Sequence, residues 1–197
     1  IGTYKIAAGR VCTGFSLPYV ATYSATGGTV TYSSGQKLAR GVNVSITPES
    51  GDDNNFYADN VLAESANTTF TGGEVTLTVD GLLEAAEKLI MGLPTSSGGW
   101  MTYNDDQAVP YVGIGFIARY QSDGVVTYVP YVLAKCMFNQ INTSAATQEE
   151  NIEFQTQELT AKIFRGDDTK HAWKYVGDEE DTEAAAEAAL KTKLGIT

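Results

Sequence analysis

The segment that most constrains the fold runs from residue 109 to 138 and reads VPYVGIGFIARYQSDGVVTYVPYVLAKCMF. At its centre, Asp123-Gly124 can adopt the positive φ angles that a two-residue turn between antiparallel strands requires. Long apolar arms flank this turn on both sides. The segment therefore predicts a β-hairpin with two long strands.

The second arm of this hairpin contains Pro130. Proline has no N–H to donate to a neighbouring strand, so it belongs at a sheet edge or at a bulge. We therefore predict an edge strand around Tyr128, Pro130 and Tyr131. A long edge strand promotes aggregation of a monomer unless another chain pairs with it or covers it.

Other segments also alternate apolar and polar residues with a period of two, which is typical of half-buried strands. Two short strands are expected around Gly27-Gly28, and a strand pair is expected over residues 152–164. The remaining strand segments are 42–47, 75–79 and 171–176. With 20 glycines and 11 tyrosines in the 197 residues, the composition also favours a mainly β chain.

Two helices are expected. Residues 82–91 place their apolar side chains on one face, with Asp80 as N-cap and Gly92 and Pro94 as the stop. A second helix is expected over 183–194, capped by Asp181 or Thr182 and ended by Gly195. Its apolar face is mostly alanine, so this helix should either dock loosely or pack closely on a flat sheet.

The charge balance limits the partners of the chain. Acidic residues outnumber Lys and Arg 24 to 13, giving a net charge of −11, and half of the acids lie between Glu149 and Thr197. Such a surface should not grip nucleic acid broadly. No run of about 18 apolar residues is present, and residues 1–14 lack the pattern of a secretory leader, so we expect synthesis in a reducing cytoplasm.

Motifs for enzyme or cofactor chemistry are few. His171 is the only histidine, and we expect it to have a structural role. Gly113 begins a GxGxxA pattern, but it lies inside a hairpin arm, so we interpret its glycines as sites of close backbone approach. The paired acids lack calcium-loop spacing. Cys136 is expected to be buried, and a bridge to Cys12 stays open. We therefore predict no catalytic, cofactor or metal residues.

A long connection without an evident strand or helix runs from residue 48 to 73. Connections longer than about 12–15 residues are unusual in compact domains. This one should therefore contain a small hairpin over 56–64, or reach out and be ordered by a partner. The expected inter-subunit contact residues are Asp52, Asp53, Asn54, Asn55, Phe56, Tyr57, Asp59, Asn60, Val61 and Leu62.

Several segments taken together resemble the major tail proteins, the tail-tube subunits of long-tailed (siphovirus-type) bacteriophages of Gram-positive bacteria. They are ATYSATGGTVTYSSGQKLARGVNVSITPES, DDNNFYADN, TFTGGEVTLTVDGLLEAAEKLIMGL, the 109–138 hairpin, IEFQTQELTAKIF and the closing W-x-Y…DTEAAAEAAL. The YADN loop after PES and the VGxGF…DGVV hairpin are the most specific. The match covers about Tyr19 to Leu194 and leaves residues 1–18 unaligned.

The resemblance implies a β-sandwich or partly closed barrel with a flanking helix, forming a single domain over residues 1–197. It also implies an N-terminal arm at 1–18, an assembly loop at 48–73 and an acidic C-terminal helical segment at 177–197. As a non-enzymatic virion protein, the chain would assemble into stacked homohexameric rings. These would form the tail tube, the conduit for viral genome ejection.

Implied partners are further copies of the chain, together with tape-measure, tail-terminator and tail-tip proteins. DNA would pass through the lumen without specific binding, and no membrane would be involved. The protein would be made in the host bacterial cytoplasm and end in the virion. A carbohydrate-binding, adhesin-like β-sandwich is the main alternative, with Tyr57, Trp100, Tyr103 and Trp173 as stacking residues. Another phage head–tail structural protein is a nearer alternative, and an enzyme is the last.

Overall fold

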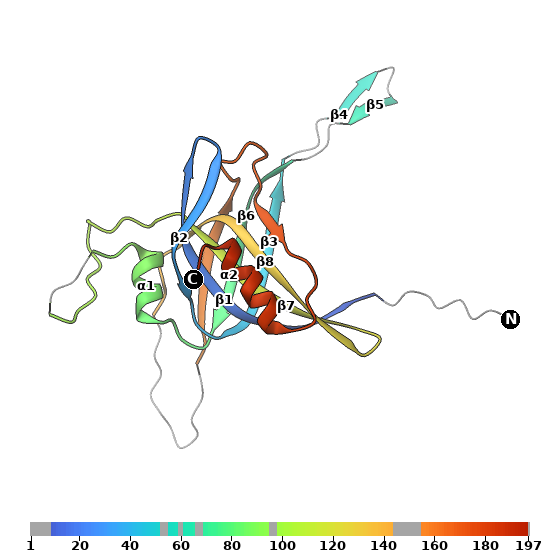
Figure 1. Ribbon diagram of the computed structural model, residues 1–197. Coiled ribbons are helices and arrows are strands. Elements are labelled where there is room, and N and C mark those ends of the chain that lie inside the picture. Colours follow the sequence, from blue (N-terminus) through green and yellow to red (C-terminus); the bar gives the residue numbers. More distant parts are fainter. Residues whose placement is uncertain are drawn as a thin grey trace.

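In the computed structural model of the chain (Figure 1), the predicted hairpin around Asp123-Gly124 is present. Asp123 has a φ of 49° and Gly124 a φ of 83°, as the two-residue turn requires. The two strands, β7 (Val112–Ser122) and β8 (Val125–Phe138), pair from Ser122↔Val125 to Val112↔Cys136. The first and strongest sequence prediction is therefore confirmed.

The structure describes residues 9–51, 55–58, 61–65, 69–94, 98–143 and 155–196, with the backbone alone at 55–58 and 61–65. The other strands are β1 (Val11–Thr26), β2 (Thr29–Lys37), β3 (Gly41–Ser50), β4 (Asn55–Ala58), β5 (Val61–Ser65), β6 (Phe70–Val79), β9 (Gln157–Phe164) and β10 (Lys174–Val176). The helices are α1 (Glu84–Met91) and α2 (Glu183–Lys193).

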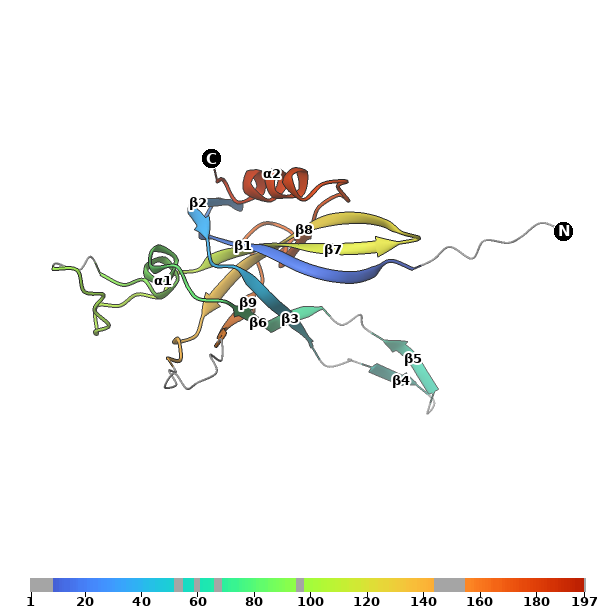
Figure 2. The ribbon, with the colours of Figure 1, turned by 90° about the horizontal axis from the view of Figure 1, so that it is seen from below.

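The protein is mainly β, as predicted. One antiparallel sheet runs in the order β2-β1-β7-β8-β9-β6-β3, and β10 pairs with β8 beside this path. The sheet folds over at β8, so that β3, β6 and β9 lie beneath β1, β7 and β8, with α2 on the outer side of the latter (Figure 2). The result is a sandwich-like arrangement with one helix as a third layer.

Two cores follow from these layers. The larger lies between the two parts of the sheet and contains Val20, Leu77, Ile114, Leu133 and Leu159, all nearly free of solvent contact. The smaller lies under α2 and joins Leu190 and Leu194 of the helix region to side chains of β1, β7 and β8. Because both faces of the middle strands are covered, every residue from Val112 to Ala118 is buried.

The glycines of the GxGxxA pattern let α2 approach the sheet. A Cβ added to Gly115 would lie 2.6 Å from Leu190 Cδ1 and 2.7 Å from Leu194 Cδ1. The alanine-rich helix therefore packs closely on β7, which was one of the two predicted outcomes. Thr182 is its N-cap, with Oγ1 accepting a hydrogen bond from the Ala185 N–H at 3.2 Å, as expected.

Helix α1 begins later than the sequence suggested. Its N-cap position is Leu83, and Asp80 instead accepts a 2.9 Å hydrogen bond from the Arg40 N–H through Oδ1. The competing backbone donor on Arg40 explains why the predicted Asp80 cap is wrong. At the other end, Gly92 stops the helix with a φ of 59°, as predicted.

The prediction of an edge strand at Tyr128, Pro130 and Tyr131 is wrong, because β8 has partners on both sides. It pairs with β7 along one side and with β9 and β10 on the other. The carbonyl of Pro130 accepts a 2.8 Å hydrogen bond from the Gly177 N–H. Because the N and C=O of one residue point to the same side of an antiparallel strand, the Pro130 nitrogen, which has no proton, also faces the segment around Gly177. The β10 ladder ends at Val176, and Glu180 resumes it with two bonds to Tyr128.

The expected N-terminal arm needs correction, and the structure also bears on the expected strand pair at 152–164 and on the two cysteines. Residues 11–18 belong to β1 rather than to an arm, because Val11 to Ser16 pair with β7; residues 1–8 lie outside the described residues. β9 pairs with β6 and β8, while residues 152–154 of the other expected strand lie outside the described residues. Cys12 is exposed and Cys136 buried, and both are free thiols.

Candidate assembly surfaces

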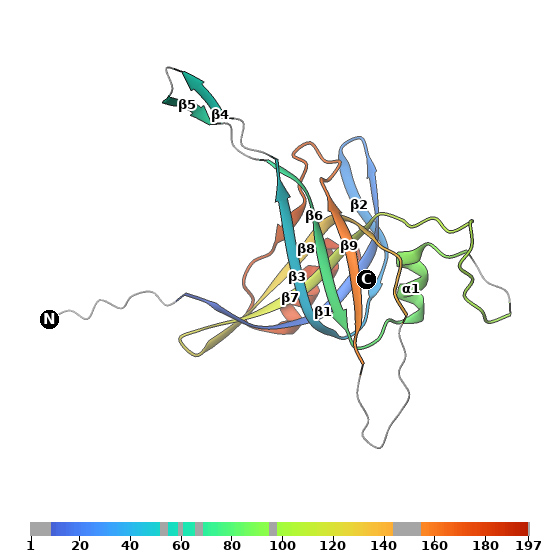
Figure 3. The same cartoon turned by 180° about the vertical axis from the view of Figure 1, so that it is seen from behind.

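The outer face of β3, β6 and β9 is a sheet surface that no described helix covers. Figure 3 shows these strands in front, with α1 at their side. The pairing register places three cross-strand rows of outward side chains here, which we call the polar face. Its members are Asn43, Thr78 and Glu158, then Ser45, Thr76 and Thr160, then Thr47, Glu74 and Lys162.

Hydroxyl and amide groups dominate the polar face, and its charges nearly cancel. Glu74 lies directly opposite Lys162 in the register, which leaves Glu158 as the unbalanced acid. Among the C-terminal acids that the structure describes, Glu158 is the one on this face. Such a surface has few cations to hold phosphates and little negative charge to repel them.

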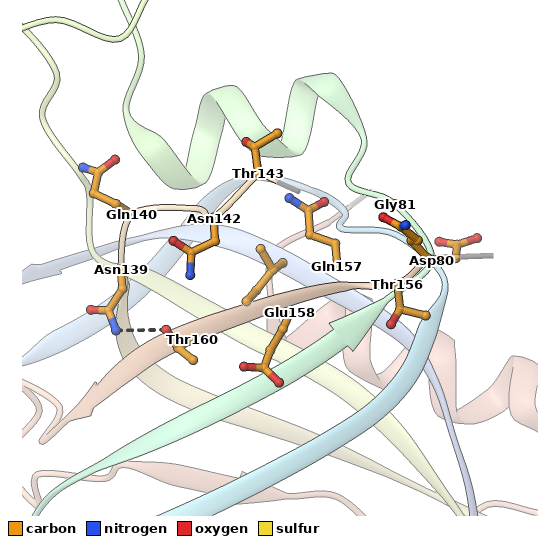
Figure 4. Close-up of a pocket in the computed structure, with 12 residues that line it drawn as sticks. Asp80, Gly81, Asn139, Gln140, Asn142, Thr143, Thr156, Gln157, Glu158 and Thr160 are labelled. Carbon is orange, nitrogen blue, oxygen red and sulfur yellow. Dashed lines mark hydrogen bonds between the residues drawn. The ribbon is translucent and has the colours of Figure 1, made fainter. Parts of the chain in front are cut away.

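At one end of the polar face lies a hollow of about 430 Å³ (Figure 4). Asn139 Nδ2 donates to Thr160 Oγ1 across it at 3.0 Å, and Gln157 Oε1 accepts from the Leu82 N–H at 3.3 Å. Its other lining residues are Asp80, Gly81, Gln140, Asn142, Thr143, Gln155, Thr156, Glu158 and Leu159. These side chains form hydrogen bonds readily, and the lining set contains neither histidine nor cysteine.

Three strands of the large sheet have a single strand partner within the described residues, and one of them, β10, is only three residues long. β2 pairs only with β1, and its edge is interrupted at Ser34, whose φ is 52°. β3 pairs only with β6, and its register is regular from Asn43 to Glu49. A long regular edge is a ready template for another strand, so β3 is the better pairing surface.

A small hairpin extends from the ends of β3 and β6. β4 and β5 pair from Asn55↔Ser65 to Ala58↔Val61, which confirms the hairpin expected in the long connection. Figure 1 shows it projecting away from the sheet. A lone two-stranded hairpin is marginally stable in water, so this one needs a further contact.

The predicted contact residues fall on and around this hairpin. Asp52, Asp53, Asn54, Asp59 and Asn60 lie outside the described residues. For the others, the structure gives the backbone course: Asn55, Phe56 and Tyr57 lie in β4, and Val61 and Leu62 lie in β5.

The histidine and its acidic neighbours stabilise a loop. His171 has a φ of 53°, and its Nδ1 lies 3.0 Å from the Gly166 carbonyl oxygen. Asp168 accepts a 2.8 Å hydrogen bond from the Ala172 N–H. The Asp167 carboxylate accepts hydrogen bonds from Lys135 Nζ at 2.7 Å and from the Tyr23 hydroxyl. The Lys135 bond in particular lowers the pKa of this carboxyl. No group of three potential metal ligands occurs in the described ranges.

The aromatic residues considered for sugar stacking come from different parts of the molecule. Trp100 is 78% exposed in the loop after α1, and Tyr103 in the same loop donates to Glu87 at 2.5 Å. Burial, followed by this bond, raises the pKa of Tyr103 to about 12. Trp173 is half-buried against Phe70, with ring centroids 4.2 Å apart. One ring face of Trp173 is therefore already occupied.

No model of a known protein family matches the sequence, and no curated protein matches it either. Among the described helices, none is long and apolar enough to cross a membrane.

Sequence reasoning predicted a polar row on each of the strands 42–47 and 75–79, but it did not identify the polar face that these strands form with β9. Its signal was present in the polar residues that alternate with Val44, Ile46, Val75 and Leu77. Alternation shows that one side of a strand is polar, but it does not reveal which sheet faces a helix covers.

Proposed function

We propose that this chain is a structural, self-assembling subunit of a phage tail tube, as its resemblance to major tail proteins suggests. Copies would close into hexameric rings, and the rings would stack into a hollow tube through which the viral genome leaves the particle. Further copies of the chain are the main partners, with tape-measure, terminator and tail-tip proteins bound at the ends of the tube.

One observation carries the proposal. The long regular edge of β3 and the projecting β4–β5 hairpin belong to the same part of the sheet, β3 and β6, which together with β9 also carries the polar face. An open edge and an isolated hairpin are liabilities for a monomer, and both are satisfied when copies associate head to tail. A head-to-tail contact that closes gives a ring, and unclosed stacking gives a filament.

The polar face also supports the proposal, because it has the properties expected of the inner wall of the tube. A wall of hydroxyl and amide groups with almost balanced charge offers DNA few lysine or arginine contacts. The opposite side of the molecule is covered by α2 and has the acidic residues 178–181 near it. The polar face is thus a bare sheet surface along which a polyanion could slide.

The alternative of a carbohydrate-binding module has weaker support. A sugar platform needs aromatic faces that are open and close together. Trp173 is stacked on Phe70, and Trp100 stands in a loop beside α1. The hollow at the end of the polar face contains no aromatic side chain.

The decisive experiment removes the hairpin. The Gly51 N–H donates to the Thr69 carbonyl at 3.2 Å, so these residues can be joined by a two-residue Asn-Gly turn in place of 52–68. We expect the shortened protein to keep the cooperative unfolding and far-ultraviolet spectrum of the wild type. Sedimentation and negative-stain microscopy should show tubes for the wild type and no tubes for the variant.

The control is a variant in which a different loop is shortened. The loop of residues 98–107 after α1 should shorten without affecting tubes, because it lies away from β3 and β6 (Figure 1). Wild-type protein that stays monomeric at all concentrations would refute the proposed function. Normal tubes from the shortened hairpin variant would refute the role of the hairpin alone.

A further inference from the structure

The root of the β4–β5 hairpin is fastened to the body of the protein by an aromatic stack. Phe70, the first residue of β6, lies parallel to the indole of Trp173, with a 4.2 Å centroid separation and 7° between the planes. Both rings are half-buried and pack against the main core. Lys174 Nζ lies 4.8 Å from the centre of the indole ring.

The two strands that lead to the hairpin are joined at the same level. Glu49 pairs with Gly72 and Ser50 pairs with Phe70, so Thr71 is an extra, bulged residue in β6, and beyond it the Gly51 N–H bonds to the Thr69 carbonyl. Thr71 Oγ1 adds a 3.2 Å bond to the Glu49 carbonyl. A bulge redirects the strand that contains it. The direction in which the chain leaves the sheet is therefore set at this point.

Trp173 is itself held by a stiff loop. The Gly166 N–H bonds to the Ala172 carbonyl, and Asp168 accepts from the Ala172 N–H. His171, in its left-handed conformation, closes the loop through its ring nitrogen. On the other side, the Trp173 carbonyl accepts a 2.9 Å bond from the Ala134 N–H of β8. The indole is thus fixed from both directions along the chain.

From this geometry we propose that Trp173 is a positioning residue for assembly, an inference that rests on the proposed function. By stacking on Phe70, it holds the root of the hairpin in one orientation, so that the hairpin is presented ready-formed to a neighbouring copy of the chain. A preorganised element loses less entropy on binding than a loosely tethered one. The hydrogen bonds of Asp168 and His171 contribute to assembly indirectly, because they hold Trp173 in place.

The test replaces Trp173 by leucine, which stays apolar but cannot stack, and by phenylalanine, which can. Hydrogen exchange of the unassembled protein should become at least about tenfold faster around 49–51 and 69–71 in Trp173→Leu, and stay near wild type in Trp173→Phe. The concentration at which tubes appear should rise by roughly tenfold for the leucine variant, as expected when one ordered side chain is lost. It should recover with phenylalanine.

Leu190→Ala is the matched control, because it also removes buried apolar contact but under α2, in the second core. It should lower stability without speeding exchange at the root or shifting the assembly concentration. Unchanged root exchange in Trp173→Leu, or an assembly shift equal to that of Leu190→Ala, would overturn the inference. Wild-type protein that forms no tubes would overturn the proposed function, and root exchange would then decide whether Trp173 anchors the hairpin.

Discussion

At the scale of single residues, Gly92 combines two constraints that are usually separate. Its φ of 59° lies in the left-handed region, and a Cβ added to it would lie 1.8 Å from the Ala108 carbonyl oxygen. Its own carbonyl accepts a 3.3 Å bond from the Ala108 N–H. The residue that ends α1 is therefore also where the returning loop packs against the helix.

Comparison with Gly27 separates the cost of the left-handed conformation from the cost of the close contact. It has a φ of 57°, but a Cβ there would meet no atom within 4 Å. We expect Gly27→Ala to lower the free energy of unfolding by about 1 kcal/mol, the cost of the left-handed conformation alone. Gly92→Ala should cost about 1–3 kcal/mol more, because the loop must move. Urea unfolding of dilute protein measures both, and equal losses would show that the close approach is relieved at no cost.

At the scale of secondary-structure elements, α2 is fastened to β1 by a carboxylate as well as by packing. Glu187 accepts a 2.5 Å hydrogen bond from the Tyr19 hydroxyl and pairs with Lys191 at 2.9 Å. The Tyr19 bond first, and then the Lys191 bond, lowers the pKa of Glu187. Because the folded pKa is lowered, this stabilisation is present above the unfolded value of about 4.3 and is lost as pH falls through the folded pKa.

The prediction concerns Glu187→Gln, whose amide still accepts the Tyr19 hydrogen bond but never ionises. Wild type should exceed the variant in unfolding free energy by about 0.3–1 kcal/mol above pH 5, and the difference should vanish towards pH 3. Glu158→Gln is the control, since this exposed carboxylate has no described hydrogen bond or ion pair. A difference between wild type and Glu187→Gln that does not vary with pH would contradict the assignment.

Elements whose signals are local were predictable from the sequence. The Asp123-Gly124 turn, the Thr182 cap and the Gly92 stop each depend on residues within one turn of chain. Asp80 and Pro130 were misread because their partners are distant in sequence: Arg40 for one, and the 177–180 segment for the other. The stack of Phe70 on Trp173 has no local signal, since about a hundred residues separate the two rings.

At the scale of the whole molecule, the fold separates a helix-covered side from a bare polar side. Period-two alternation predicted that the strands around 42–47 and 75–79 have one polar row each. It did not predict that α2, 100 residues later, covers β1, β7 and β8 instead. Which surface stays bare is a property of the layer arrangement, and the proposed assembly rests on that surface rather than on any motif.

If the polar face lines a tube, its accessibility should depend on the size of the probe. Cysteine labelling tests this, because burial strongly raises the pKa of the Cys136 thiol and leaves it unreactive. In a Cys12→Ser background, Thr76→Cys places a thiol on the polar face, and Ala188→Cys places one on the exposed side of α2. In unassembled protein, both thiols should react with a small maleimide and with a polymer-linked maleimide.

In assembled tubes, the Thr76→Cys thiol should still react with the small reagent but become protected from the polymer-linked one by at least about tenfold, because a long coil loses entropy on entering a narrow channel. The Ala188→Cys thiol should keep reacting with both reagents. Protection of Ala188→Cys with free reaction of Thr76→Cys would place the helix side inward, and α2 with its neighbouring acids would then face the DNA.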